Sequence, residues 1–398
     1  MSNSTELIHN HMPDSEFGLV NLPIYNGSTV VYRDYENFVN ATKDRFSSYY
    51  KTGFGNYGRF GNIATNKLEK LLADAEFGKF CVLTPSGLSA LTNAIYTFVK
   101  FGDHILITDT CYYQTKAFVR SLSKINVSYT IVPIGIKNEE IKNFIKENTT
   151  LFIIESPGSQ LLEVLDIEFI AKFCKEKNIV SIFDNTWATP LFCNPIKFGF
   201  DVVVHSLTKF VLGHSDAMMG AIISNSEENA RKIYQTAVDF GVKVDGHTTY
   251  LATRGMKTLK VRIDANYNQL KVGLEKLKQL QNKYSNKIQQ ILSPYCSDFP
   301  SHNLWKKFYT GATPVLSIRL DRQYNHQEIA KAINSRKLLS LGLSWGGFES
   351  MITHFTPSET RIKESGYDEV SYFRIYLGFE EIDDIINDIE LVIKNLPK

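Results

Sequence analysis

Cysteine is scarce in this sequence, and its spacing fits neither disulfides nor a metal. Five of the 398 residues are cysteines, an odd number, and no two of them form a C-x-x-C pair. The sequence therefore predicts neither a disulfide framework nor a zinc knuckle. We expect a protein of a reducing cytoplasm that uses no metal.

Long apolar runs and a strong net charge are also missing. No run approaches the roughly 20 residues that a membrane-spanning helix needs, and the first residues lack the basic patch and apolar core of an export signal. The formal net charge of +2 gives no reason to expect nucleic acid or a membrane surface as a partner. There is no P-loop or G-x-G-x-x-G, which leaves ATP-dependent and nicotinamide-dependent enzymes without support.

Short apolar runs alternate with helical patterns through the middle of the chain. Such alternation predicts an α/β fold whose sheet is mostly parallel and covered on both faces. The runs expected as strands lie at 104–109, 130–135, 151–156, 179–184, 202–206 and 221–225.

The last third has a second set of elements, which predicts a smaller α+β domain. Expected there are strands at 315–320 and 373–378, a helix near 326–335 and a closing helix from Glu380. We interpret 241–262 as the linker that leads into a long helical pattern. The predicted division is an N-terminal arm, a large domain and a small domain, at 1–57, 58–246 and 247–398.

The predicted arm shows few regular elements but many aromatic residues between Tyr32 and Tyr57. Exposed aromatic surface of this extent needs a cover. Either the arm folds back over its own domain, or it reaches onto another subunit.

One lysine stands out in the stretch 201–220. The β-branched run Val202–Val204 is typical of a buried strand, so Lys209 is expected just beyond its carboxyl end. In open α/β sheets that edge binds ligands, and a lysine removed from bulk water can act as an amine nucleophile. An arbitrary lysine is more often a surface residue. Here, however, Ser206 and Thr208 add two hydroxyls that suit a bound phosphate.

Pyridoxal phosphate (PLP) requires such a combination, together with a carboxylate for its ring nitrogen. Asp184 ends a predicted strand and is the candidate carboxylate. Tyr112 follows the first predicted strand, where its ring could stack on a pyridine ring or simply pack against the protein.

Two further stretches could hold a phosphate. Ser86 can cap a helix whose first backbone amides, those of Gly87 and Leu88, would be free to bind an anion. Tyr57 and Arg59 combine a hydroxyl with a guanidinium that can bind one phosphate, although an ordinary loop with a surface arginine would look the same.

The motifs SLTKFVLGHSDAMMG, FDNTWATPLFCNP and ESPGSQLLEV resemble those of the PLP-dependent enzymes of cysteine and methionine metabolism, the transsulfuration family. The resemblance runs from residue 56 to residue 386 and is closest to the bacterial cystathionine β-lyases. It implies the type I PLP-dependent transferase fold, like that of aspartate aminotransferase. It also implies a homo-oligomer, at least a dimer and by expectation a homotetramer.

The resemblance assigns roles on the cofactor side. It makes Lys209, Asp184 and Tyr112 the catalytic residues, with Tyr112 stacked on the cofactor ring. Tyr57 and Arg59 are expected to contact the cofactor phosphate of a neighbouring subunit.

It also assigns roles around the substrate. Ser159 is placed near the cofactor's 3-oxygen, and Arg374 is expected to bind the substrate α-carboxylate with help from Ser344, while Trp345 lines the pocket. From the residues alone, an arginine in the apolar strand pattern around Arg374 predicts an internal aspartate or glutamate partner instead.

The activity implied is carbon–sulfur β-elimination, in which cystathionine is cleaved to homocysteine, pyruvate and ammonia. The alternatives are a cystathionine γ-synthase, a γ-lyase or a methionine γ-lyase. Gln114 disfavours the last, because methionine γ-lyases carry a cysteine at that position. A non-catalytic relative that keeps the fold for binding is a further alternative, which the retention of Lys209, Asp184 and Arg374 disfavours.

Overall fold

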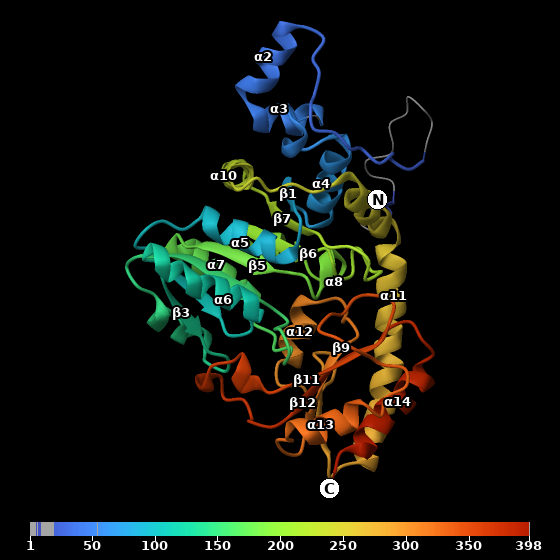
Figure 1. Ribbon diagram of the computed structural model, residues 1–398. Helices are drawn as coiled ribbons and strands as arrows, with labels where there is room; N and C mark the ends of the chain where they lie inside the picture. The colour runs from blue at the N-terminus through green and yellow to red at the C-terminus, as the bar shows by residue number, and fades with distance from the viewer. Residues whose placement is uncertain (1–4, 6, 9–19, 54, 398) are drawn as a thin grey trace.

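Two β-sheets, connected by one long helix, organise the chain (Figure 1). The structure is a computed structural model that describes Thr5, Leu7, Ile8, residues 20–53 and residues 55–397. The helix α11 (Gly246–Lys283) packs against α4 beside the large sheet, and against β8 and α14 in the small-sheet part. It therefore spans both halves of the molecule.

The large sheet is mostly parallel, as the sequence predicts. Its strand order is β1-β7-β6-β5-β4-β2-β3, and only β7 runs antiparallel to its neighbours. The strands are β1 (Phe80–Thr84), β2 (His104–Thr108), β3 (Ser128–Val132), β4 (Thr149–Glu155), β5 (Val180–Asp184), β6 (Val202–Ser206) and β7 (Gly220–Ser224).

Both faces of this sheet are covered. Successive side chains of a strand point to opposite faces, so Phe183 lies in one core cluster and Ile182 in the other. The cluster around Phe183 includes side chains of α4 (Ile63–Ala75) and α7 (Ile167–Lys177). The opposite cluster includes side chains of α5 (Gly87–Thr97), α6 (Tyr113–Ser121) and α10 (Glu227–Asp239). Short helices α8 (Thr189–Phe192) and α9 (Pro195–Phe198) follow β5.

The small sheet has the order β10-β11-β12-β9-β8 and is antiparallel except between β10 and β11. Its strands and helices are β8 (Ile288–Leu292), α12 (His302–Phe308), β9 (Val315–Leu320), α13 (His326–Ile333), β10 (Ser340–Leu341), β11 (Met351–Phe355), β12 (Tyr372–Tyr376) and α14 (Ile382–Asn395).

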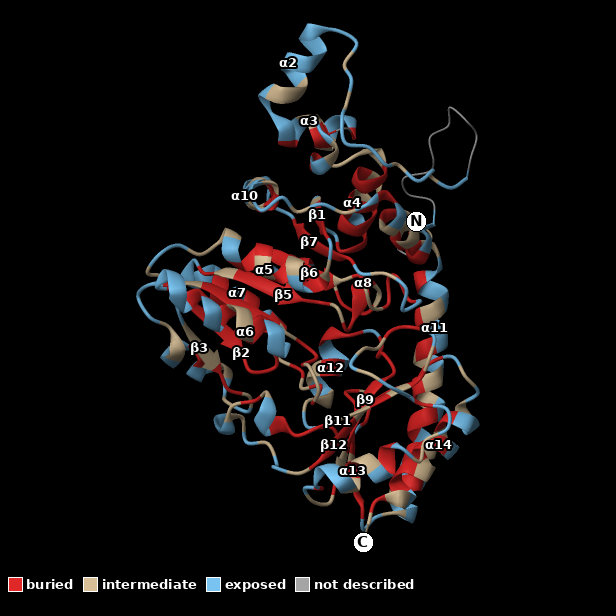
Figure 2. Cartoon of the chain, viewed as in Figure 1, coloured by how far each residue is buried: buried red, intermediate tan, exposed pale blue. Residues whose placement is uncertain are grey.

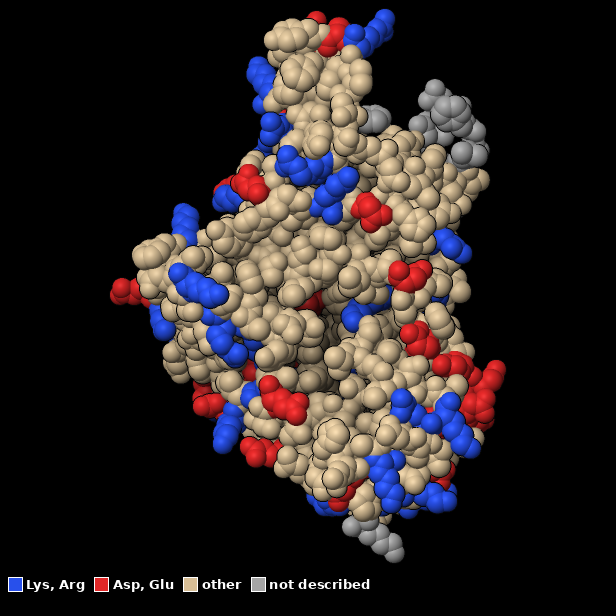
Figure 3. All heavy atoms as spheres, in the orientation of Figure 1, with Lys and Arg blue, Asp and Glu red and all other residues tan. Residues whose placement is uncertain are grey.

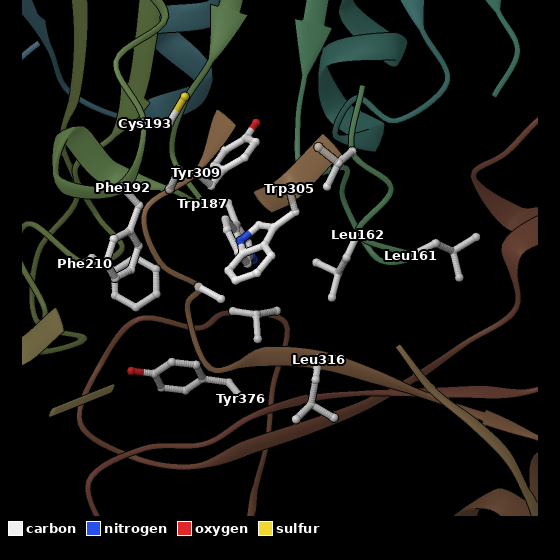
Figure 4. Packing of buried hydrophobic residues seen from close by; sticks show 14 of the residues in the cluster. Leu161, Leu162, Trp187, Phe192, Cys193, Phe210, Trp305, Tyr309, Leu316 and Tyr376 are labelled. Atoms are coloured by element: carbon white, nitrogen blue, oxygen red, sulfur yellow. The ribbon is translucent and has the colours of Figure 1, made fainter. Parts of the chain in front are cut away.

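One apolar core joins the two sheets. The cluster that contains Phe183 also contains Leu316 of β9 and Tyr376 of β12. Figure 4 shows Trp187 and Tyr309 lying between elements of the two sheets, and their rings meet edge to face at 6.3 Å. The small sheet is thus packed onto the large sheet through buried aromatic contacts.

The predicted linker and the arm both contain helices. The stretch 241–262 is helical from Gly246, because it is the first part of α11. The arm contains α2 (Tyr35–Lys43) and α3 (Arg45–Thr52), which project from the body (Figures 1 and 2). The sequence of α2 does carry apolar residues at helical spacing, namely Tyr35, Phe38 and Val39, although the helix buries none of its residues.

The arm also folds back in part over its own domain. Phe46 and Tyr49 are buried in the cluster that contains α10, whereas Tyr35 is 79% exposed. No helix in the part of the chain that the structure describes is both long and apolar enough to cross a membrane. The proposed division at residues 57 and 246 stays a prediction.

Candidate active site

Three strands of the large sheet end side by side at one edge. The register pairs Glu155 at the end of β4 with Asp184 at the end of β5, and β6 ends next to them at Ser206. Paired residues of neighbouring strands point to the same face. The carboxyl edge therefore brings two carboxyl groups and a hydroxyl together, where the sequence predicts a ligand site.

Lys209 lies in the turn after β6 and reaches toward the small sheet. Its Nζ donates to Ser344 Oγ at 2.8 Å and lies 5.2 Å from the centre of the Trp345 ring. Burial lowers the pKa of Lys209 to about 8, the positive charge of Arg374 adds to the shift, and Asp184 opposes it. At pH 7 about a tenth of this amine is therefore unprotonated and able to accept a proton, far more than for an ordinary lysine.

Asp184 is buried and keeps one carboxylate oxygen available. Its Oδ1 accepts both from the Thr186 amide at 3.0 Å and from Thr186 Oγ1 at 2.5 Å. In the described chain no hydrogen bond engages Oδ2. Burial raises the pKa of Asp184, against the effect of the Thr186 hydrogen bonds and of the nearby His205 and Lys209. A buried carboxylate of this kind favours a cationic partner.

The beginning of α5 forms a cradle beside Ser206. Ser86 caps the helix by accepting from the Ser89 amide at 3.1 Å, as predicted. The amides of Gly87 and Leu88 have no acceptor among the described residues, because they precede the first intrahelical hydrogen bond. A Cβ on Gly87 would lie 2.4 Å from Ser206 Cβ, so only glycine permits this approach.

Thr208 is occupied within the turn. Its Oγ1 lies 3.2 Å from both the carbonyl oxygen and the amide nitrogen of Met219. The hydroxyl therefore closes the turn around Lys209 in addition to any contact with a phosphate.

Tyr112 lies at the start of α6, and the residue is 46% exposed. Its amide donates to Glu155 Oε2 at 2.6 Å, which fixes the backbone that carries the ring. Burial raises the pKa of Glu155 well above its ordinary value, and the adjacent Asp184 adds to the shift. Glu155 thus favours its neutral form, which concentrates the negative charge of the pair on Asp184.

Arg374 projects from β12 on the substrate side. Its Nη2 donates to the Leu343 carbonyl at 2.9 Å. Burial lowers the pKa of Arg374 to about 10, with Tyr112 opposing the shift. The expectation of an internal carboxylate partner is wrong, since no aspartate or glutamate in the described chain lies within ion-pair distance of Arg374. A half-buried guanidinium without a counter-ion suits the carboxylate of a ligand.

The structure does not bring every predicted residue to this edge within one chain. Arg59 donates to the Val238 carbonyl of α10 at 3.2 Å and stacks on Phe60. None of its contacts among the described residues involves Lys209 or its neighbours. Ser159 does lie near the strand ends, where its amide donates to the Thr110 carbonyl at 2.8 Å.

These groups fit the requirements of pyridoxal phosphate. Lys209 supplies the amine, Asp184 Oδ2 is free for a protonated ring nitrogen, and the α5 cradle supplies amides and the Ser206 hydroxyl for a phosphate. Figure 3 shows a hollow between the two halves of the molecule, with acidic side chains inside it and basic ones at its rim. Such a distribution suits a ligand that carries both charges.

Comparison with known proteins gives the same assignment. The chain matches the family described as Cys/Met metabolism PLP-dependent enzyme over residues 4–394. The chain belongs to this family. Pyridoxal phosphate is therefore its cofactor, and the candidate site is the place where that cofactor fits.

Relatives within the family differ in activity. The L-alanine/L-glutamate racemase of Wolbachia pipientis wMel is 36% identical over 391 residues, which cover 96% of this chain and 94% of the racemase. The cystathionine beta-lyase MetC of Escherichia coli (strain K12) is 31% identical over 380 residues, with 94% and 93% covered.

Solved structures confirm the fold. The crystal structure of metB from Corynebacterium glutamicum superposes with a TM-score of 0.86 at 29% identity, and covers 100% of this chain and 99% of that one. A cystathionine gamma synthase from Xanthomonas oryzae pv. oryzae, solved in complex with cystathionine, gives a TM-score of 0.87 at 21% identity, with 100% and 98% covered. The predicted type I PLP fold is correct.

Sequence reasoning missed two residues that shape this site. Thr186 has a detectable signal, because an aspartate followed two residues later by a hydroxyl residue is typical of a local turn that the aspartate side chain closes. Glu155 has none, since its role follows from the register of β4 against β5.

Proposed function

We propose that this protein is a carbon–sulfur β-lyase that cleaves L-cystathionine to homocysteine, pyruvate and ammonia. One observation supports it most: Lys209 Nζ, with its pKa near 8, is held 2.8 Å from Ser344 Oγ between Asp184 and the unpaired Arg374. That arrangement suits removal of a proton from the α-carbon of an amino acid whose carboxylate is bound by Arg374.

Each side chain has one task in this mechanism. When bound, pyridoxal phosphate supplies the electron sink that makes the α-proton of an amino acid acidic. Arg374 binds and orients the substrate carboxylate, and Ser344 holds the Lys209 amine beside the α-carbon. Lys209 accepts the α-proton. Asp184 keeps a negative charge where a ring nitrogen needs it. The homocysteine thiolate then leaves from Cβ of the substrate.

Product analysis tests the proposal. The purified, cofactor-loaded protein is incubated with L-cystathionine, and the keto acid and the thiol are identified. Pyruvate with homocysteine supports β-cleavage. If 2-oxobutyrate and cysteine dominate, the γ-enzymes of the family are the right comparison and the β-lyase proposal is wrong.

Racemisation is a second candidate, favoured by the relative at 36% identity. Both reactions begin with removal of the α-proton, and they diverge afterwards. A substrate with a thioether sulfur at Cβ can break the Cβ–S bond and release a thiolate, whereas alanine or glutamate can only regain a proton. Chiral analysis after incubation with L-alanine and L-glutamate decides between them. Appearance of the D-isomers at a kcat/KM above that for cystathionine would make racemisation the principal activity.

We also propose that a neighbouring subunit completes the phosphate site with Tyr57 and Arg59, in a dimer or a homotetramer. The support is that Arg59 contacts α10 in its own chain and Tyr57 is 43% exposed, while α2 exposes aromatic side chains. Mixed oligomers of Arg59→Ala and Lys209→Ala chains test this. Recovery of some activity after verified mixing is expected, because some sites then have both residues. Absence of recovery would place both residues in one chain.

A cytoplasmic location remains our prediction. It is supported by five cysteines that are all buried and free, which fits a reducing compartment.

A further inference from the structure

A buried ionic cluster connects the two halves of the molecule beside the candidate site. It consists of Asp109 just after β2, Lys116 of α6, and Arg361 in the β11–β12 connection (residues 356–371). Their side chains are 0%, 3% and 2% exposed. Because burying a charge is costly unless it is paired and hydrogen-bonded, a cluster placed here calls for an explanation.

Asp109 and Lys116, which belong to the large-sheet half, hold the backbone of the β11–β12 connection. Lys116 Nζ donates to Asp109 Oδ1 at 2.9 Å and to the Thr360 carbonyl at 2.5 Å. Asp109 Oδ2 accepts from Ser365 Oγ at 2.6 Å and from the Ile362 amide at 3.2 Å. The carboxylate and the ammonium therefore hold Thr360, Ile362 and Ser365.

Arg361, in the β11–β12 connection, in turn binds residues of the large-sheet half. Its Nη2 donates to the Ser159 carbonyl at 2.7 Å and to Glu163 Oε2 at 2.8 Å. Its buried Nη1 has no hydrogen-bond partner and lies 3.9 Å from Asp109 Oδ2. Glu163 and Asp109 balance the two cations, so the cluster is neutral as a whole.

The two ends of this cluster lead directly to the two sides of the site. Lys116 lies in the first turn of α6, and its amide donates to the Tyr112 carbonyl at 3.2 Å. The β11–β12 connection leads into β12, which carries Arg374. The distance between the ring of Tyr112 and the guanidinium of Arg374 thus depends on how tightly the connection is held.

We propose that Arg361, acting with Asp109 and Lys116, is a positioning residue that sets the location of Arg374 relative to the cofactor side and thereby determines the affinity for the amino-acid substrate. This inference rests on the proposed function, in which Arg374 binds the substrate carboxylate. Arg361 itself touches neither the substrate nor the cofactor.

Kinetics and amide exchange of an Arg361→Gln variant test the proposal. Its KM for L-cystathionine or L-alanine, whichever the protein turns over, should rise about 10-fold or more, since small misplacements of a binding group are costly. The absorbance spectrum of the bound cofactor should not change. Hydrogen–deuterium exchange of residues 360–366 in the cofactor-loaded protein should become faster.

A milder variant and a matched control accompany it. Ser365→Ala removes the hydrogen bond to Asp109 and the acceptor for the Ile134 amide, but it buries no unpaired charge, so it should fold and raise KM by about 2- to 5-fold. Arg322→Gln removes an exposed arginine that pairs with Glu328 in the small-sheet half, and should change neither KM nor exchange.

The outcomes separate this inference from the function on which it rests. If hydrogen–deuterium exchange of residues 360–366 were unchanged in both Arg361→Gln and Ser365→Ala, the claim that the cluster holds this segment would be wrong. Faster exchange with unchanged KM would overturn the positioning role. If the wild-type protein turns over no amino acid, the proposed function fails, while the exchange measurement still decides whether the cluster holds residues 360–366.

Discussion

The two sides of the candidate site are built in different ways. On the cofactor side, Asp184 and Lys209 follow neighbouring strands of one sheet, 25 residues apart in sequence. On the substrate side, Arg374 lies in β12 of the second sheet and Ser344 in the β10–β11 connection, where it accepts from Lys209 of the other half. Strand register therefore fixes the groups that do the chemistry, whereas contacts between the two halves fix the groups that bind the substrate. Changes on the first side should lower kcat, and changes on the second should raise KM.

Replacing Lys209 should have the largest effect. Lys209→Ala removes both the amine that the cofactor aldehyde requires and the base for the α-proton, so kcat should fall at least about 10³- to 10⁴-fold. Circular dichroism should show an unchanged fold. Borohydride treatment should fix the cofactor covalently to the wild type at Lys209 and not to the variant.

A matched variant, Lys172→Ala, removes a lysine that is 77% exposed on α7 and should behave as the wild type. Substantial turnover by Lys209→Ala would show that Lys209 is neither the cofactor-binding amine nor the base for the α-proton.

Asp184→Asn should come next on the same side. The substitution keeps the shape and the Thr186 hydrogen bonds but removes the negative charge, so we expect kcat to fall on the order of 10²-fold or more, as when one preorganised electrostatic partner is lost. Cofactor affinity, measured by equilibrium dialysis, should fall as well. A variant with wild-type kcat would show that the ring nitrogen needs no charge from Asp184.

Arg374→Leu probes the substrate side. Loss of a charge-assisted pair is worth about 1.5–3 kcal/mol, so kcat/KM should fall roughly 10- to 150-fold, and most of the loss should lie in KM. Arg374→Lys keeps the charge but not the paired donors, and should recover part of the loss. If Arg374→Leu lowered kcat alone, the division of labour between the two sides would be wrong.

Prediction from sequence does not divide along this line, because β9 and β12 of the small sheet were predicted whereas β1 of the large sheet was not. The strands that end at Asp184 and Ser206 were predictable, because fully buried parallel strands are continuous apolar runs. β8 and β11 were not predicted, since the first carries two glutamines and the second a threonine and a histidine within five residues. Short strands with mixed polarity give no periodic signal.

The same limit applies to the site residues. Lys209 and Asp184 could be found because each follows a strand that the sequence marks. The cluster of Asp109, Lys116 and Arg361 could not, because it joins residues about 250 positions apart and depends on the way the halves meet. For Arg374, the residues alone favoured an internal carboxylate, and only the folded chain shows that its acceptor is the Leu343 carbonyl.

The pH dependence of cofactor loading sharpens the comparison further. With a pKa of about 8 for Lys209, about a quarter of the amines are unprotonated at pH 7.5, against ~0.1% for an ordinary lysine. The rate at which the cofactor-free protein takes up pyridoxal phosphate, followed by absorbance, should rise with pH with a midpoint near 8. A midpoint above 10 would contradict the burial of this amine.

Substitutions on the cofactor side and on the substrate side should shift the midpoint pH of cofactor uptake in opposite directions. Arg374→Leu removes a positive charge that lowers the pKa of Lys209, so its midpoint should lie higher. Asp184→Asn removes a negative charge that raises the same pKa, so its midpoint should lie lower. Shifts in the same direction would show that the charges of the two sides do not act on Lys209 as the structure indicates.

The smallest effect on turnover is expected at Glu155. Burial raises its pKa well above the ordinary value, so near neutral pH the folded protein holds a proton on Glu155 that the unfolded chain has released. The folded state then binds more protons than the unfolded state, and the stability contribution of this group falls as pH rises above about 4.5. In Glu155→Gln the side chain is neutral at every pH, and its amide oxygen can still accept from the Tyr112 amide.

The Glu155→Gln variant should change kcat less than about 3-fold. In the cofactor-free protein, its Tm should gain on the wild type between pH 6 and pH 8. Glu155→Leu, which removes the acceptor, should lower the Tm at both pH values because it leaves the Tyr112 amide without a partner. If the difference in Tm between Glu155→Gln and the wild type stayed constant from pH 6 to pH 8, Glu155 would be ionised in the folded protein and would share the negative charge of the pair with Asp184.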